Sequence, residues 1–225
     1  MLAANVIQLR QMLSEKFPGL RQQLAEPAVV ENVQPAYLPQ IDAALHGGFP
    51  RGALTEIVSA GPSAGSALLL RELLARAAAQ NQIVTLIDGA DSLDVAEIDE
   101  AALSRLLWLR CRSLKEALKA ADLVLRDRNL PLVLIDLKVI SPRQLQQVQA
   151  ATWYRFQRLI EETATVCVVF TTRPVVTPAQ ARITLHSKFS IAELDLDKHQ
   201  LLTGLKMQID HVHQFSRAEI RQRIA

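Results

Sequence analysis

Apolar and polar positions along the chain form blocks that predict strands and helices in turn. Short, mostly apolar runs predict strands over 54–58, 83–87, 106–111, 132–136 and 166–170, and all of these except 106–111 contain β-branched residues. Apolar residues three and four positions apart predict a helix over 67–80 and further helices that begin at Ser113 and Ser141. Ser113 with Glu116 has the spacing of a capping box. This alternation indicates an α/β fold whose mostly parallel sheet is covered by helices on both faces.

The two ends of the chain have different patterns from this middle part. Residues 1–24 predict an amphipathic N-terminal helix, and the prolines in 25–40 indicate a linker. The core domain is expected over 41–213, and 214–225 form a basic C-terminal tail. Alternating positions in 190–196 and 205–212, on either side of Thr203-Gly204, predict a C-terminal antiparallel hairpin.

Composition and charge exclude several classes of protein. Of 225 residues, 49% are apolar and the formal net charge is +2, so disorder is not expected and charge alone does not indicate nucleic acid. The longest apolar runs are far shorter than the ~20 residues of a membrane span, and the charged N-terminus does not have the pattern of a signal peptide. Cys111 and Cys167 lie in apolar stretches without a Cys-x-x-Cys pattern, which indicates buried, reduced thiols in a cytoplasmic protein.

Glycines crowd one region, where five of the eight fall within nineteen residues: Gly47, Gly48, Gly52, Gly61 and Gly65. A strand, a glycine-rich loop and a helix are the setting of a phosphate-binding loop. A working loop ends in Gly-Lys-Ser/Thr, whereas here Ser66 and Ala67 follow Gly65. Each charge-assisted hydrogen bond lost with the lysine is worth about 1.5–3 kcal/mol, so affinity for a triphosphate is expected to be weak.

Asp136 follows four apolar residues, which is the form of a Walker B strand. One interpretation is a vestigial nucleotide site made by Gly61, Gly65, Ser66, Ala67 and Asp136. The favoured interpretation is a loop that only connects strand to helix, with Asp136 capping the next turn. We therefore expect neither ATP nor magnesium as a cofactor.

Five cations late in the chain are candidates for contact with nucleic-acid phosphates: Arg182, Lys188, Arg217, Arg221 and Arg223. The alternative is a solvated basic tail. His211 and His213 lie on one predicted strand, but a metal site would need further ligands, and surface histidines are expected. Trp153 is expected to pack in the core or an interface rather than to stack on bases.

The run IDAALHGGFPRGALTEI, residues 41–57, resembles the entry to the ATPase core of the RecA family. Its PRGALTE segment resembles the ImuA family, accessory proteins of bacterial mutagenic repair cassettes, and is similar to the SulA group of SOS-induced division inhibitors. The resemblance spans about residues 38–212, and 87–94 resemble the second RecA strand with its loop. It implies a RecA-like three-layer fold.

This chain lacks several residues on which ATP hydrolysis depends in the RecA family. Where RecA has a catalytic glutamate this chain has Ala90, with Asp91 beside it, and Thr171-Thr172 replace the Asn-Gln that ends the sensor strand. Only seven residues, 174–180, stand where RecA has a long DNA-binding loop. With the loop lysine and hydroxyl also missing, ATP hydrolysis is not expected, because that chemistry depends on positioning and charge stabilisation.

The resemblance therefore implies a non-catalytic accessory protein of the SOS DNA-damage response that supports DNA repair by translesion synthesis. Its implied partners are RecA or the machinery of a Y-family polymerase. One alternative is an unusual ATPase that uses Ser66, Asp91 and Asp136, and another is a SulA-like division inhibitor. The N-terminal helix has three open roles: self-association, partner binding in a helix-in-groove mode, and packing on its own domain.

Overall fold

The computed structural model describes residues 33–59, 61, 63–96, 98–190, 193 and 195–211. The expected N-terminal helix over 1–24 and the basic tail over 214–225 lie outside the described residues. Three of the candidate phosphate-contacting cations, Arg217, Arg221 and Arg223, lie there too.

A seven-stranded sheet forms the centre of the described structure, with strand order β5-β4-β6-β7-β3-β8-β9. Its strands are β3 (Ala53–Ser59), β4 (Val84–Asp88), β5 (Leu106–Arg110), β6 (Leu132–Asp136), β7 (Val166–Thr171), β8 (Ala181–Leu185) and β9 (Met207–His211). All neighbouring strands pair in parallel except β8 and β9, which are antiparallel. The prediction of a mostly parallel α/β sheet is confirmed.

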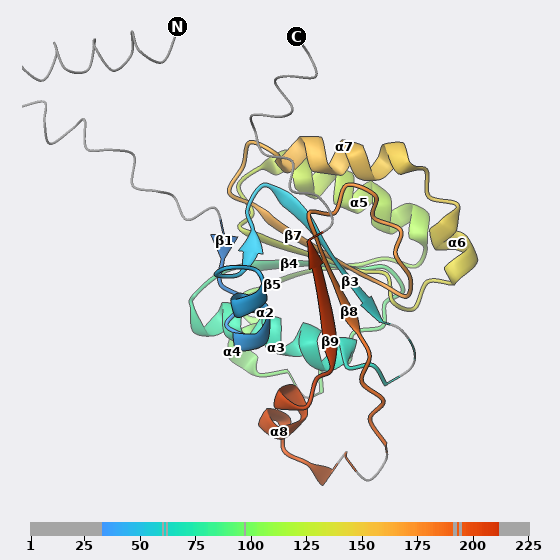
Figure 1. Cartoon of the computed structure of the whole chain (residues 1–225). Coiled ribbons are helices and arrows are strands. Elements are labelled where there is room, and N and C mark those ends of the chain that lie inside the picture. The colour runs from blue at the N-terminus through green and yellow to red at the C-terminus, as the bar shows by residue number, and fades with distance from the viewer. Residues whose placement is uncertain are drawn as a thin grey trace, which may run out of the picture. The chain divides into compact units, whose positions relative to one another are not determined.

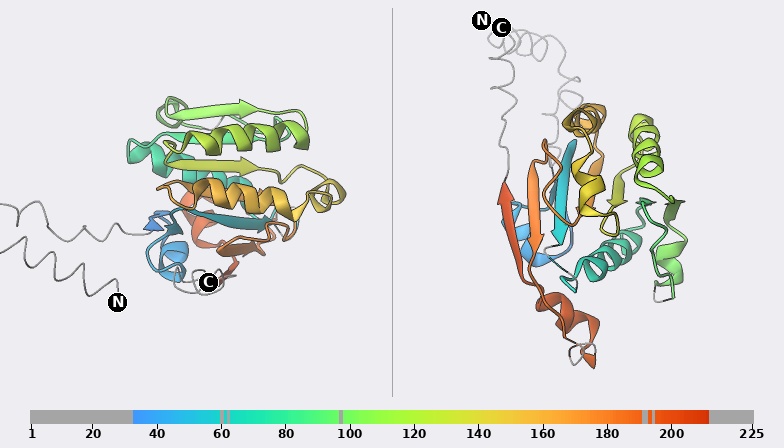
Figure 2. Two further views of the ribbon diagram at one scale, coloured as in Figure 1. Left: turned by 90° about the horizontal axis from the view of Figure 1, so that it is seen from above. Right: turned by 90° about the vertical axis from the view of Figure 1, so that its right-hand side faces the viewer.

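Helices cover both faces of this sheet (Figure 1). One face carries α2 (Pro39–Ala44), α3 (Ser66–Ala79) and α4 (Glu100–Leu103), and the other carries α5 (Leu114–Asp127), α6 (Pro142–Gln146) and α7 (Ala150–Ile160). Figure 2 shows α5 and α7 side by side on their face. In the described part of the chain, no helix combines the length and apolar character needed to span a membrane.

Burial follows the position of each strand in the sheet. The central strands β3, β4, β6 and β7 are buried at every position, because helices cover both of their faces. The edge strand β5 is half-buried or exposed throughout, and β8 alternates between buried and half-buried positions. The apolar runs over 132–135 and 166–170 therefore belong to strands in the middle of the sheet, whereas the apolar run over 106–109 forms an edge strand.

The predicted C-terminal hairpin forms in part and in a different place. Its second strand is β9, but the first is β8, at residues 181–185, so the strand expected over 190–196 is wrong. Instead, α8 (Lys198–Thr203) lies in the connection and begins with a capping box made by Asp197 and Gln200. Pairing with β3 in the sheet selected 181–185, whereas alternation along the sequence does not identify the partner of a strand.

The folded part begins earlier than the prolines suggested. Residues 33–40, expected to belong to the linker, include β1 (Val33–Gln34), which pairs antiparallel with β2 (Phe49–Pro50) in a separate two-stranded sheet. Ala36 and Leu38 are buried. Pro39 occupies the first turn of α2, a position that needs no N–H donor, so this proline starts a helix rather than marking a linker.

The helix expected from Ser141 is divided into α6 and α7. Ser141 caps α6 by accepting a hydrogen bond from the N–H of Gln144, and Gln149 precedes α7. The division changes the helical register, so α7 buries Trp153, Phe156 and Ile160. The core role expected of Trp153 is confirmed.

Candidate functional site

The loop between β3 and α3 lies where the sequence placed a phosphate-binding loop. Gly65 is the N-cap of α3 in a left-handed conformation (φ 96°), and Ser66 begins the helix. A Cβ on Gly65 would collide with the side chain of Leu205 and come within 3.3 Å of the ring of Phe189. The N–H of Phe189 also donates to the carbonyl of Ser63 at 3.3 Å. Apolar groups from the β8–β9 connection therefore pack beside the N-terminus of α3. In a working phosphate-binding loop, a lysine would place positive charge there.

Asp136 ends β6, two strands away from β3, and its side chain is buried. The ammonium of Lys138 forms an ion pair with this carboxylate, and the N–H of Lys138 donates to it at 3.1 Å. Burial raises the pKa of Asp136 above its ordinary value, and the charge and hydrogen bonds of Lys138 oppose that rise. Asp136 thus caps the turn that follows it, as the favoured interpretation expected.

Asp88 pairs in register with Asp136 at the end of the neighbouring strand β4. Its carboxylate accepts hydrogen bonds from the N–H groups of Ser92 and Leu93, both at 2.9 Å, and from the indole of Trp108 at 3.3 Å. These bonds fold the segment after β4 back onto the carboxylate. The oxygens of Asp88 therefore serve the turn that follows the strand.

Asp91, beside the position of the missing catalytic glutamate, is also engaged. Its two oxygens accept from Nε and a terminal nitrogen of Arg110 at 2.5 and 2.9 Å. The hydrogen bond from Arg110 lowers the pKa of Asp91. The same guanidinium lies 4.8 Å from the centre of the Trp108 ring, which further fixes its position.

Glu56 lies inside β3 and is fully buried. It accepts hydrogen bonds from the hydroxyl of Thr171 and from the N–H groups of Val175 and Val176, at 2.8 to 3.1 Å. Arg182 on β8 completes the cluster, with Nε 2.8 Å from the second carboxylate oxygen. This ion pair joins β3 to β8 and to the segment that follows β7.

Some hydrogen-bonding capacity at this edge of the sheet is unused. The hydroxyls of Ser59 and Thr172 and Nε of Arg173 are buried, and none has a hydrogen-bond partner within the described residues. Ser59 and Thr172 end or follow the adjacent strands β3 and β7. Because buried polar groups usually have partners, these atoms suit a small polar guest such as water.

The structure brings together some of the residues singled out in the sequence. Gly61, Gly65, Ser66 and Ala67 lie in or after the loop, and Asp136 lies at the same carboxyl edge of the sheet with β7 between them. Arg182 does not point to solvent as a phosphate contact would, because its guanidinium is bound to Glu56 and its side chain is only 21% exposed. Lys188 is exposed on the connection after β8.

Sequence reasoning missed the groups that neutralise the acids. Lys138 stands two residues after Asp136, so a local signal for that ion pair was present in the sequence. Arg110 and Arg182 lie 19 and 126 residues from their partners, and no sequence signal could have joined them. Leu205, which is buried against the loop, was likewise unforeseen.

No group of three or more histidine, cysteine, aspartate or glutamate residues within the described ranges is arranged to hold a metal ion. Comparison with models of protein families returned no match, and comparison with curated protein sequences returned none. The described structure defines an α/β protein with a mostly parallel, mixed seven-stranded sheet and a separate two-stranded antiparallel sheet. At its carboxyl edge lies a glycine-containing loop whose neighbouring acids are bound to cations or backbone of the same chain.

Proposed function

We propose that this chain is a non-catalytic accessory protein with a RecA-like fold, similar to the ImuA family, that acts in the SOS DNA-damage response. It works by docking onto a protein, with RecA or the translesion polymerase machinery as the partner class. The motif over residues 41–57, which runs from within α2 through β2 and into most of β3, motivates the RecA-like assignment. Docking rather than turnover explains why the scaffold persists without the catalytic groups.

The observation that carries this proposal is the state of the acids at the carboxyl edge. A nucleotide-bound magnesium ion needs a carboxylate that is free to bind it, directly or through water. The carboxylate of Asp136 already forms an ion pair with the ammonium of Lys138. The carboxylate of Asp88 accepts hydrogen bonds from the backbone that follows it. The loop itself supplies no lysine, and Leu205 packs against it. These features support a site without ATP chemistry.

The ATPase alternative would use Ser66, Asp91 and Asp136, and the contacts of these residues weigh against it. Asp91 is held by Arg110 and is not free to position water, since both its oxygens accept from the guanidinium. Ser66 carries no charge to offset a phosphate. The favoured function is therefore the docking protein.

A nucleotide assay tests the non-catalytic part of the proposal. Purified full-length chain is expected to show no magnesium-dependent ATP turnover and no shift in melting temperature with millimolar ATP and magnesium. Asp136→Ala serves as the control, because it removes the one buried carboxylate with Walker B position. Turnover by the wild-type chain that is lost in Asp136→Ala would overturn the proposal.

A genetic assay tests the pathway. Deleting the gene in the organism that encodes this chain is expected to lower damage-induced mutagenesis and to leave growth without damage unchanged. Overproduction is expected to leave cell length normal. Long, unseparated cells on overproduction, with unchanged mutagenesis in the deletion strain, would point to a division inhibitor instead.

A further inference from the structure

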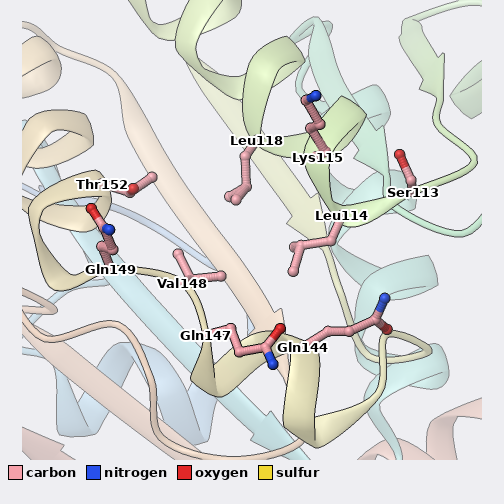
Figure 3. Close-up of a pocket in the computed structure, with 9 residues that line it drawn as sticks. All are labelled: Ser113, Leu114, Lys115, Leu118, Gln144, Gln147, Val148, Gln149 and Thr152. Carbon is pink, nitrogen blue, oxygen red and sulfur yellow. The ribbon is translucent and has the colours of Figure 1, made fainter.

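A pocket of about 520 Å³ opens between the N-terminal half of α5 and the corner where α6 meets α7. Figure 3 shows Leu114 and Leu118 of α5 pointing into the space from one side and Val148 from the other. All three are partly buried side chains that pack on the core of this face. The pocket therefore offers a preformed aliphatic wall that a single apolar side chain could cover.

Polar groups surround this apolar wall. The amides of Gln144, Gln147 and Gln149 line the α6–α7 side, and Lys115 lines the α5 side. A glutamine amide both donates and accepts hydrogen bonds, so the rim suits the backbone of a peptide. None of the residues that line the pocket is acidic.

The helices around the pocket carry a cationic surface. Together α5, α6 and α7 contain six lysines and arginines against three acids, whereas the whole chain has a net charge of only +2. Asp122, the acid on the side of α5 that faces α7, is already bound to Arg126 and Arg155, both at 3.0 Å. Lys119 follows Lys115 by one helical turn, so both exposed ammonium groups lie on one side of α5.

This pocket is separate from the glycine loop. The loop leads into α3, which packs on one face of the sheet, and the pocket lies among helices of the opposite face. A peptide segment held in the pocket would therefore lie on the opposite face of the sheet from α3.

We propose that the pocket between α5 and the α6–α7 corner binds an acidic peptide segment of a partner protein through one apolar anchor side chain. The anchor inserts between Leu114, Leu118 and Val148, and carboxylates of the peptide pair with Lys115 and Lys119. The cationic helices and the absence of acids in the lining supply the charge complementarity. The proposal rests on the docking function above and gives it a surface and a class of ligand.

A nucleic acid is a less suitable ligand for this cationic surface than an acidic peptide. Sequence-tolerant binding of single strands uses aromatic side chains as stacking platforms. The pocket lining has none and is aliphatic at its centre. Tyr154 on α7 is 56% exposed but is not among the lining residues.

A peptide-display selection tests the proposal. The full-length chain is used to select from a random library of twelve-residue peptides, and the enriched peptides are synthesised with a fluorescent label. The selected sequences are expected to combine aspartate or glutamate with one leucine, isoleucine or phenylalanine. Their affinity, measured by fluorescence anisotropy, is expected to fall as salt is added.

Two variants and a control locate the binding. Lys115→Glu/Lys119→Glu changes exposed side chains only and is expected to weaken a selected peptide about tenfold or more, because attraction becomes repulsion. Val148→Asp is expected to abolish binding, with circular dichroism confirming that it is folded. Lys188→Glu, the same charge change on the exposed connection after β8, is expected to leave affinity within about twofold.

Three outcomes would overturn the proposal. They are a failure to enrich any peptide, enrichment of peptides without acidic residues, and equal affinity for the wild-type chain and Lys115→Glu/Lys119→Glu. Binding of a labelled twenty-nucleotide oligo-dT that is weakened by the same double variant, without any peptide selected, would assign the face to nucleic acid. The ATP assay is independent of these readouts, so peptide binding and the non-catalytic function can fail separately.

Discussion

Replacing Arg182 by methionine would test the ion pair inside the sheet. Glu56 has no exposed surface, and Arg182 is the only cation bound to it in the part of the chain that the structure describes. Arg182→Met keeps much of the side-chain volume but leaves a buried carboxylate with three neutral donors. Removing one partner of a buried pair costs about 3–5 kcal/mol. For a chain of this size that corresponds to a fall in melting temperature of roughly 6–20 °C.

Urea denaturation followed by tryptophan fluorescence, to which the buried Trp153 contributes together with Trp108, would measure this loss. Lys188→Met is the matched control, because it removes an exposed cation and is expected to change the free energy of unfolding by less than about 0.5 kcal/mol. Adding Glu56→Gln to Arg182→Met is expected to restore part of the loss, since an amide is less costly to bury than a charge. A loss below about 1 kcal/mol in Arg182→Met, or no recovery in the double variant, would refute the reasoning.

Three further predictions concern the loop, a thiol and the docking of α8. Gly65→Ala is expected to destabilise the protein by at least about 1 kcal/mol in urea denaturation, because its φ is 96° and its Cβ would strike Leu205. Cys167, whose pKa burial raises to about 12, is expected to resist Ellman's reagent at pH 8 until urea unfolds the chain. Lys198→Met is expected to lower stability at neutral pH, because Glu72 bridges Lys198 at 2.8 Å and Arg76 at 2.5 Å.

The pH dependence of the last variant follows from the direction of the shift. Burial tends to raise the pKa of Glu72, but the bonds from Lys198 and Arg76 outweigh it and the pKa is lowered below 4.5. A lowered carboxyl pKa contributes stability that is complete above the unfolded value and is lost as the pH falls through the folded one. The difference between wild type and Lys198→Met should therefore shrink as the pH falls below about 4.5.

Controls keep these results specific. Gly61→Ala is expected to be neutral, because no atom of the described residues lies within 4 Å of the added Cβ. A neutral Gly65→Ala, rapid labelling of Cys167 in the native state, or a Lys198→Met effect that grows on acidification would each contradict the contact from which it was derived.

Much of the fold was predictable because strongly buried strands have a strong signature. The runs that became β6 and β7 are apolar at every position but the last, a pattern that suits strands covered on both faces, whereas β3 and β4 also contain buried polar residues. The N-cap Ser113 was also readable locally, since its hydroxyl accepts from the N–H of Glu116. β8 was misplaced because its pairing with β3 and β9 decides its position, and α8 was not predicted although Asp197 and Gln200 form a capping box at its start.

The sequence by itself determined which chemical groups the candidate site lacks. Ser66 stands where a working loop has lysine, and Ala67 stands where it has serine or threonine, whatever the fold. The expectation of weak triphosphate binding therefore rests on residue identity alone. What occupies the site instead was decided by the tertiary structure. Leu205 reaches Gly65 from 140 residues away, and the β8–β9 connection brings it there.

The same division applies to the charges. From the sequence, Arg182 was a candidate for contact with nucleic-acid phosphates. The parallel pairing of β3 with β8 placed its guanidinium beside Glu56 instead. A buried carboxylate needs a counter-charge close by, and only the folded chain determines which cation is within reach. The acids and bases of this protein could be counted from its sequence, whereas their pairing depended on the order of strands in the sheet.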